Sequence, residues 1–366
     1  MLTKQQPTVS VIIKALNEEQ HIAAAIESAI AALGETDGEV ILADGGLSDR
    51  TVEIARRYPV VIVRLNRSED RSCGSGAQLG FQYSRGRYLL LMDGDQQLRP
   101  GFIPAAMETL RRDPALAGVG GKLFEYGVVN EEYEQRIKRY DPDGRVGFVT
   151  RLNSSGLYRR TAIESIGYVT DRNLHGAEEF DLGARLHAAG WKLARIDHPI
   201  VDHNPDPGSA YRLLLRRVLN KNASATGELF RAAIGRRHFW FIVGKDRNVF
   251  LCLFVTGWWI ALALASFALS GWSAVSAIGA LLLLPFAVMS LRWRSVRLGL
   301  YSVTALNVFA LCFWPGLLRA RTSPAGWIDS TVLQAPDEAG AANQARPFGH
   351  GSRAHAPDAD GRKTLQ

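Results

Sequence analysis

The chain has 366 residues, which is enough for one large domain with an appendage or for two domains. Its formal charge is +7, but no nucleic-acid-binding motif accompanies the basic residues, so we expect no nucleic-acid partner. The three cysteines, two of them inside apolar runs, argue against a disulfide framework and for a cytosolic soluble part.

Apolar runs and segments with helical spacing alternate along the first hundred residues. We expect strands at 9–13, 40–43, 60–65 and 88–92. We expect helices around 22–33, with Asn17 as the cap, from 51 towards 58, and in a segment that runs through Phe81. This alternation predicts an α/β fold with a parallel, doubly wound sheet. The chain lacks a Gly-x-Gly-x-x-Gly turn after the first strand and a Gly-x4-Gly-Lys loop, which argues against dinucleotide and P-loop folds.

The strand at 88–92 ends directly in Asp93-Gly94-Asp95. Open α/β sheets place their ligands at the carboxyl ends of strands, where Asp44 also follows the second strand. Two carboxylates one residue apart suit a hard divalent cation, which usually brings a phosphorylated substrate. A solvated Asp-Gly turn is the simpler alternative.

A second group of acids begins an expected helix near residue 178. Glu178, Glu179 and Asp181 stand in its first turn, and Leu182 and Leu186 face inward. The helix dipole favours acids at this end, so a purely structural role is one interpretation. Three acids in four positions exceed what a cap requires, and a general base is the other interpretation.

Taken together, these segments resemble the family 2 glycosyltransferases, which have the GT-A nucleotide-sugar-binding fold. Four motifs occur in the order of that family, at 9–19, 39–51, 88–95 and 176–182. The resemblance covers about residues 8 to 235. It implies a Rossmann-like, mostly parallel sheet domain that binds a nucleotide-sugar donor together with Mg2+ or Mn2+.

The resemblance implies a role for the acids already noted. Asp44 matches the acid that hydrogen-bonds the nucleotide base. Asp93 matches the first acid of the Asp-x-Asp motif, which contacts the ribose or the metal, and Asp95 matches the second, which ligates the cation on the diphosphate. Glu179 falls where the family usually has an aspartate as general base, with Asp181 in reserve.

Further positions match donor-site segments of the family. They are Ala15, Asn17, Glu18, Gly156, Arg159 with its neighbour Arg160, and Glu178. His203 lies where some members place a metal or diphosphate contact, although a lone histidine after a strand is often structural. Two substitutions depart from the family pattern, because Lys14 replaces a common proline and Leu47 interrupts a Gly-Ser-Thr-Asp run. The Gln-x-x-Arg-Trp motif of processive synthases is missing after His203.

The activity implied by the resemblance is inverting transfer of a sugar from a nucleotide-sugar donor, with a UDP-sugar favoured. The expected acceptor is a hydroxyl of a lipid-linked glycan in exopolysaccharide or other cell-surface polysaccharide synthesis. Polyprenyl phosphate is an alternative acceptor. A non-catalytic membrane protein that binds sugar nucleotides is the alternative from another class.

The rest of the chain predicts a membrane anchor. We expect a glycosyltransferase domain at 1–209, a basic amphipathic juxtamembrane segment at 210–247, a transmembrane region at 248–320 and a disordered tail at 334–366. The juxtamembrane segment holds nine Lys or Arg against two acids, which attracts anionic membrane lipids and marks the cytoplasmic side. We therefore expect a multi-pass plasma-membrane protein whose catalytic domain is cytoplasmic.

The number of spans stays open at this point. The apolar runs 249–269, 274–291 and 298–318 are each long enough to cross a bilayer. Three spans, slightly favoured, would leave Arg319 and Arg321 on the outer side, against the positive-inside rule. A re-entrant third segment would keep the tail inside.

Overall fold

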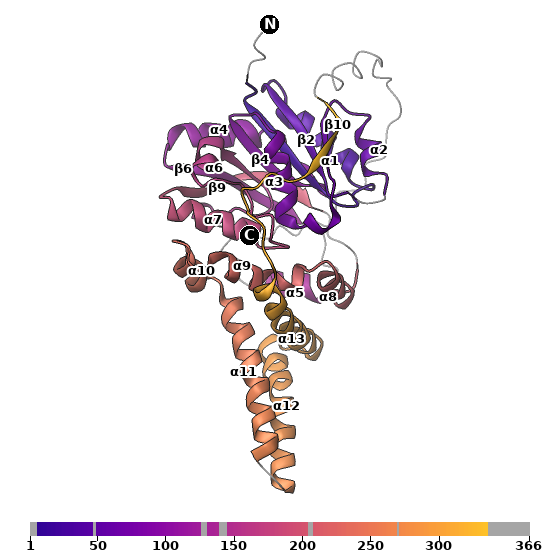
Figure 1. Cartoon of the computed structure of the whole chain (residues 1–366), viewed down its shortest axis with the longest axis vertical. Helices are drawn as coiled ribbons and strands as arrows, with labels where there is room; N and C mark the ends of the chain where they lie inside the picture. Colours follow the sequence, from indigo (N-terminus) through magenta and orange to yellow (C-terminus); the bar gives the residue numbers. More distant parts are fainter. Residues whose placement is uncertain are drawn as a thin grey trace.

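The computed structural model describes residues 6–46, 49–125, 130–138, 145–203, 208–268 and 271–335. A domain of sheet and helices forms one end of the molecule, and α11 and α12 extend far from it as a hairpin (Figure 1). The strands are β1 (Val9–Ala15), β2 (Gly38–Asp44), β3 (Val61–Leu65), β4 (Tyr88–Asp93), β5 (Gln96–Leu98), β6 (Leu116–Glu125), β7 (Gly147–Val149), β8 (Gly156–Arg159), β9 (Lys192–His203) and β10 (Ser330–Gln334).

Helices cover the sheet and then continue as the apolar C-terminal part. They are α1 (Ile22–Leu33), α2 (Thr51–Ala55), η1 (Ser68–Asp70), α3 (Cys73–Tyr83), α4 (Phe102–Arg112), α5 (Glu131–Lys138), α6 (Arg160–Ser165), α7 (Glu178–Ala188), α8 (Ala210–Leu219), η3 (Asn222–Ser224), α9 (Ala225–Ala233), α10 (Phe239–Lys245), α11 (Arg247–Ala268), α12 (Trp272–Trp293) and α13 (Val296–Leu318).

The sheet has a parallel centre and mixed flanks. Its order is β10-β3-β2-β1-β4-β8-β6-β9-β5, with β7 also paired to β9. The four predicted strands β1 to β4 are parallel to one another, as expected. β8 runs antiparallel to β4 and starts the mixed part of the sheet. Because β1 lies between β2 and β4, the carboxyl ends of these three strands meet at one edge.

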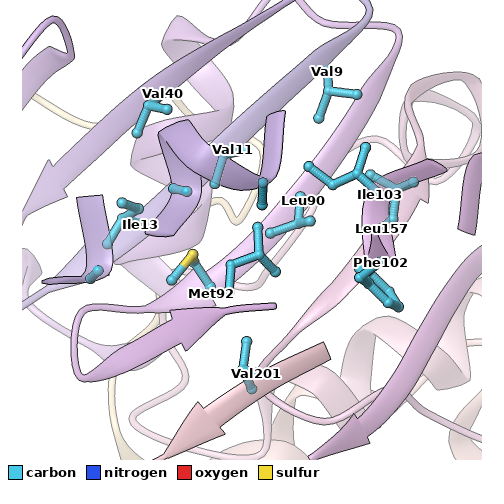
Figure 2. Close-up of a cluster of buried hydrophobic side chains, with 14 of the residues drawn as sticks. Val9, Val11, Ile13, Val40, Leu90, Met92, Phe102, Ile103, Leu157 and Val201 are labelled. Carbon is cyan, nitrogen blue, oxygen red and sulfur yellow. The ribbon is translucent and has the colours of Figure 1, made fainter. Parts of the chain in front are cut away.

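Both faces of the central strands are buried, which explains their unbroken apolar runs. On one face Val11 of β1 and Leu90 of β4 pack against α1 and α4, and Figure 2 shows them beside Phe102 and Ile103 of α4. On the other face Ile12 packs in a second cluster that includes Leu182 and Leu186 of α7. The core therefore fixes the sheet edge on which β1 and β4 end.

The first helix begins later than the sequence predicts. Asn17 has a φ of +62°, in the left-handed region that asparagine tolerates better than most residues. His21 is the residue before α1, which starts at Ile22. Asn17 is therefore part of the turn after β1, and its prediction as a helix cap was wrong.

The C-terminal part returns to the domain that it leaves. The helices α11, α12 and α13 are all long and apolar enough to cross a membrane. After α13 the chain runs back to the sheet, where β10 pairs antiparallel with β3 and Val332 lies opposite Val63 (Figure 1). Gln334 thus belongs to a strand and not to the predicted tail, and residues 336–366 lie outside the described part.

Candidate active site

The predicted acids come together at the carboxyl edge of the parallel strands. In the sheet register Ala15 lies opposite Asp44 of β2, and Lys14 lies opposite Asp93 of β4. A parallel sheet brings strand ends side by side, so residues far apart in sequence share this edge. Asp44 is buried, and its Oδ2 accepts a hydrogen bond of 2.6 Å from Arg64 Nε.

Lys14 is the centre of the charged group at this edge. Its Nζ lies 2.9 Å from Asp93 Oδ1, 3.3 Å from Glu178 Oε1 and 3.9 Å from Glu179 Oε1. The side chain is only 12% exposed, so one buried ammonium joins the Asp-x-Asp turn to the start of α7. Burial by itself lowers the pKa of Lys14, but Asp93, Glu178 and Glu179 together raise it well above the ordinary value. Lys14 is therefore a fixed positive charge.

Glu179 is the more accessible of the two glutamates. Its side chain is 23% exposed, against 6% for Glu178. Ala177, the residue before α7, has a φ of +60°, so the chain turns sharply into the helix that carries both acids. Burial and then the charge of Glu178 raise the pKa of Glu179, and Lys14 opposes this shift. A carboxylate with a raised pKa is suited to accepting a proton.

The segment before α7 is held from two sides. The backbone N–H of His175 donates to Glu228 Oε2 at 2.8 Å, and His175 Nδ1 lies 2.9 Å from Glu228 Oε1. Arg319, just after α13, contacts the same Glu228 carboxylate. The position of the α7 acids therefore depends on α9 and on the end of the apolar C-terminal part.

Glu18 lies close to the two aspartates of the Asp-x-Asp turn, so three acidic side chains gather here. Asp95 Oδ2 lies 3.3 Å from His203 Nε2. This contact forms because β5 pairs with β9 and places Gln96, the residue after Asp95, opposite His203. A Cβ added to Gly94 would lie 2.9 Å from Glu18 Cγ, which places Glu18 directly against the turn. Burial, followed by the charges of Asp95 and Asp93, raises the pKa of Glu18 to about 8. Such repulsion marks a position where a cation would be stabilised.

The residues at this turn fit a divalent cation that is completed by other ligands. Asp95 Oδ1 is shielded from solvent and has no hydrogen-bond partner among the residues that the structure describes, so a carboxylate oxygen remains available. Burial raises the pKa of Asp95, but the hydrogen bond and charge of His203, a backbone hydrogen bond and the charge of His21 together lower it below the ordinary value, which keeps the group ionised. Within the residues that the structure describes, no group of three or more His, Cys, Asp or Glu is arranged to hold a metal alone. Mg2+ commonly takes one or two carboxylates and fills its remaining positions with phosphate and water.

Arg159, one of the predicted site residues, lies at the opposite end of β4 from the charged group. Arg159 lies opposite Tyr88, at the start of β4, and five residues of strand correspond to about 17 Å from Asp93. Its guanidinium donates to the backbone oxygens of Leu110 and Leu116. Gly156 is nearer the site, opposite Leu91. The structure therefore does not bring Arg159 to the other predicted residues.

Asp181, the reserve candidate for the base, points away from this group. It is 1% exposed, and its Oδ2 accepts a hydrogen bond of 2.7 Å from Arg185 Nε. Arg185 also donates to the backbone oxygens of Tyr168 and Val169. Arg185, which pairs with Asp181, thus anchors α7 to the preceding loop.

Comparison with known proteins gives the family of this part of the chain. Residues 10–168 match the family model described as glycosyl transferase family 2. The chain carries a family 2 glycosyltransferase domain. That match includes Lys14, Asp44, Asp93 and Asp95, while the α7 acids lie beyond it.

Relatives and a solved structure extend the similarity of the glycosyltransferase domain. A dolichol-phosphate mannosyltransferase of Pyrococcus furiosus is 29% identical over 33% of this chain and 35% of its own length. The uncharacterized glycosyltransferase EpsJ of Bacillus subtilis is 23% identical over 67% of this chain and 75% of its own. A mannosyltransferase from Pyrobaculum calidifontis in complex with GDP-Man and Mn2+ superposes with a TM-score of 0.52 at 18% identity, covering 86% of this chain and 88% of that one. This last likeness shows the fold, which is of the GT-A type.

Gln96 and Lys14 make contacts in the site that the sequence did not predict. Gln96 is buried, accepts a hydrogen bond of 3.0 Å from the backbone N–H of Asp93 and contacts Ser154 and Ser155. The sequence signal that could have identified Gln96 is its position immediately after the Asp-x-Asp motif. Lys14 was visible only as a departure from the family pattern, because its partners are up to 165 residues away in sequence.

Proposed function

We propose that this protein is an inverting glycosyltransferase that moves a sugar from a nucleotide-sugar donor, with a UDP-sugar favoured, to a hydroxyl of a lipid-linked glycan. The observation that carries this proposal is the contact of Lys14 with Asp93 on one side and with Glu178 and Glu179 on the other. It joins the candidate donor-binding turn to the candidate base. A merely structural acidic helix start would not need a buried cation shared with the Asp-x-Asp turn.

In the proposed reaction Glu179 accepts the proton of the acceptor hydroxyl. The acceptor oxygen then forms a bond to the anomeric carbon while the bond between that carbon and the diphosphate oxygen breaks. Lys14 holds Glu179 and Asp93 in a fixed relation, so that the base and the donor stay aligned. Glu178, which is nearly buried, contributes to holding Lys14.

The donor would lie along the edge formed by β1, β2 and β4. We assign contact with the nucleotide base to Asp44, whose carboxylate also accepts a hydrogen bond from Arg64. Ala15, Asn17 and Glu18, at the end of β1 and in the turn after it, would contact the neighbouring part of the donor. Asp95, with His203 beside it, would hold Mg2+ or Mn2+, which when bound supplies positive charge for the departing diphosphate.

A phosphate acceptor is the second candidate, and one observation favours it. The similar protein of Pyrococcus furiosus is named a dolichol-phosphate mannosyltransferase. A polyprenyl phosphate is already ionised and needs no general base. Replacement of Glu179 by Gln separates the candidates, since it would impair transfer to a hydroxyl and leave transfer to a phosphate nearly unchanged.

We propose that residues 1–209 bind the donor, that 210–247 lie at the membrane surface, and that the apolar region anchors the protein in the plasma membrane with the catalytic domain in the cytoplasm. The exposed apolar side chains of α8, among them Leu215 and Leu219, support this placement. Cytosolic nucleotide sugars would then have direct access to the site.

Thermal stabilisation of the full chain in detergent tests donor binding directly. The full chain is needed, because β10 completes the sheet from beyond the apolar helices. We expect one class among UDP-, GDP- and dTDP-sugars to raise the melting temperature, and Mn2+ to enlarge the effect. Asp95→Asn should remove the Mn2+-dependent part, whereas Asp197→Asn, at a side chain that is 73% exposed, should retain it. Absence of any shift with all three donor classes would contradict the proposal.

A further inference from the structure

Both ends of α13 contact the glycosyltransferase domain. Near its start, Arg297 Nη2 lies 2.6 Å from Glu134 Oε2 of α5. One turn later, Tyr301 Oη donates to Glu132 Oε2 of α5 at 3.1 Å. Just beyond its end, Arg319 contacts Glu228 of α9, and Arg321 contacts Asp171 of the glycosyltransferase domain. The helix is therefore tied to the domain at two places about a helix length apart.

This geometry is incompatible with a membrane span. A helix of 23 residues is about 34 Å long, close to the thickness of the hydrocarbon core. If α13 crossed the bilayer, one of its ends would lie on the far side from the domain. The return of the chain to β3 as β10 agrees, because it places residues 330–334 on the domain side as well.

The helix contacts α11 near the middle of α11, at Thr256 and Trp259. Trp259 Nε1 donates to Asn307 Oδ1 at 2.6 Å, and Trp314 Nε1 donates to Thr256 Oγ1 at 3.2 Å. In Figure 1 α11 and α12 extend well beyond α13, which stays close to α8 and α9. The hairpin of α11 and α12 therefore extends farther from the domain than α13 does.

The exposed face of α13 is apolar and continues other apolar surfaces. In the most apolar 18-residue stretch of α13, 39% of the residues are buried inside the protein. The same share is 17% for α11 and zero for α12. The large side chains that stay exposed on α13 include Val296, Leu300, Leu311 and Leu318. Exposed apolar side chains on α8 and α10 include Leu215, Leu219 and Trp240.

We propose that only α11 and α12 cross the membrane and that α13 lies in the plane of the bilayer surface, with its exposed apolar face in the boundary between headgroups and acyl chains. The occupant of this face is lipid, because the face is continuous with the hairpin, which is apolar and exposed along its length. Arg292 and Arg294 precede the helix, so its start carries charge suited to anionic headgroups. Arg319 and Arg321 follow the helix and pair with Glu228 and Asp171, which keeps them on the side of the domain. This arrangement removes the conflict that three spans create with the positive-inside rule.

Labelling of single cysteines in sealed membrane vesicles tests the topology. In a chain whose Cys73, Cys252 and Cys312 are replaced, cysteines are introduced by Glu35→Cys, Trp272→Cys, Val296→Cys and Ser323→Cys. An impermeant maleimide should label 35, 296 and 323 from one face and 272 from the other. Labelling of 296 and 323 from opposite faces overturns the proposal.

A second test avoids dependence on the cysteine-free chain. With native cysteines kept, protease sites are added before Met1 and after Gln366 of the full chain. Two spans predict that both sites are cleaved from the same face of the vesicle. Cleavage from opposite faces gives an odd number of crossings and overturns the proposal.

Depth measurements distinguish an in-plane helix from one that is merely on the same side. Nitroxide labels at Leu300→Cys, Leu311→Cys and Leu318→Cys are compared with a label at Leu264→Cys, an exposed position of α11 beyond its contact with α13, by their relative accessibility to oxygen and to a water-soluble nickel complex. We expect similar, shallow values along α13 and a deeper value at 264. A deep value at 311 flanked by shallow ones indicates a span, and fully aqueous values along α13 exclude lipid contact, so either result contradicts the proposal.

Discussion

Lys14 joins two acidic groups that the sequence keeps far apart. Its ammonium lies within 4 Å of one oxygen each of Asp93, Glu178 and Glu179. Without a positive charge these carboxylates would repel one another, and Glu179 would be harder to ionise. The protonation state of the proposed base therefore depends on a lysine that stands where the family commonly has proline.

The pH profile of transfer should show this dependence. Because Lys14 lowers the pKa of Glu179 and burial raises it, Lys14→Met should raise that pKa further. Since the base acts when deprotonated, the acid limb of kcat should move to higher pH. Lys122→Met, which removes an ion pair with the exposed Asp197, is the matched control and should leave the limb in place. An unchanged limb in both variants would argue against Glu179 as the group that titrates.

Glu179 and Asp181 should respond differently to removal of their charge. We expect Glu179→Gln to lower kcat by roughly 10²–10⁴-fold with little loss of donor binding. Asp181→Asn removes the charge that pairs with buried Arg185, so it should mainly lower the melting temperature. Kinetics and thermal unfolding of both variants check this. A larger loss of kcat in a folded Asp181→Asn protein would show that the wrong carboxylate was assigned.

Helices and strands with local signals could be predicted from the sequence, and those with distant partners could not. The strands β1 to β4 have continuous apolar runs because both of their faces are buried. β10 has only five residues, and its pairing with β3 spans about 265 positions of sequence, so no local pattern predicts it. The same reason explains α13, whose length and hydropathy suit a span but whose ends are fixed by ion pairs with α5 and α9.

The packing of α9 on α13 depends on glycine. A Cβ at Gly227 of α9 would lie 2.0 Å from the backbone oxygen of Phe313, whereas one at Gly244 of α10 would have no atom of the described part of the chain within 4 Å. Gly227→Ala should therefore separate α9 from α13 and lower the melting temperature. Gly244→Ala should be neutral or stabilising by up to about 1 kcal/mol, because alanine favours helix. Thermal unfolding in detergent checks both, and equal effects of the two changes would contradict the packing described.

At the scale of the whole molecule, the membrane part and the catalytic part are a single structural unit. The end of α13 contacts Glu228, which holds His175, and His175 lies three residues before Glu178. Asp44, Asp93 and Asp95 could be predicted together because their strands are parallel, while Arg159 was misplaced because β8 runs antiparallel to β4. A resemblance in one motif does not fix which end of the sheet the residue reaches.

Two truncated chains test whether the catalytic domain depends on the segment that follows α13. A chain that ends after Leu318 lacks the contacts of Arg319 and Arg321 as well as β10, and its catalytic domain should lose stability. A chain that ends after Ala335 keeps them and should melt like the full chain. The comparison is made by thermal unfolding of both proteins in detergent. Equal melting temperatures would mean that the returning segment does not support the domain.

The most direct measurement is transfer of a labelled sugar to lipid in membranes that contain the full chain. With the stabilising nucleotide sugar and Mn2+, we expect label in the lipid extract for the native chain and for Asp197→Asn. Asp93→Asn and Asp95→Asn should each lower transfer by at least about 10²-fold, because each change removes a carboxylate that is positioned to bind the donor or the cation on its diphosphate. Near-normal transfer by both of these variants would contradict the assignment of the active site to the carboxyl end of β4.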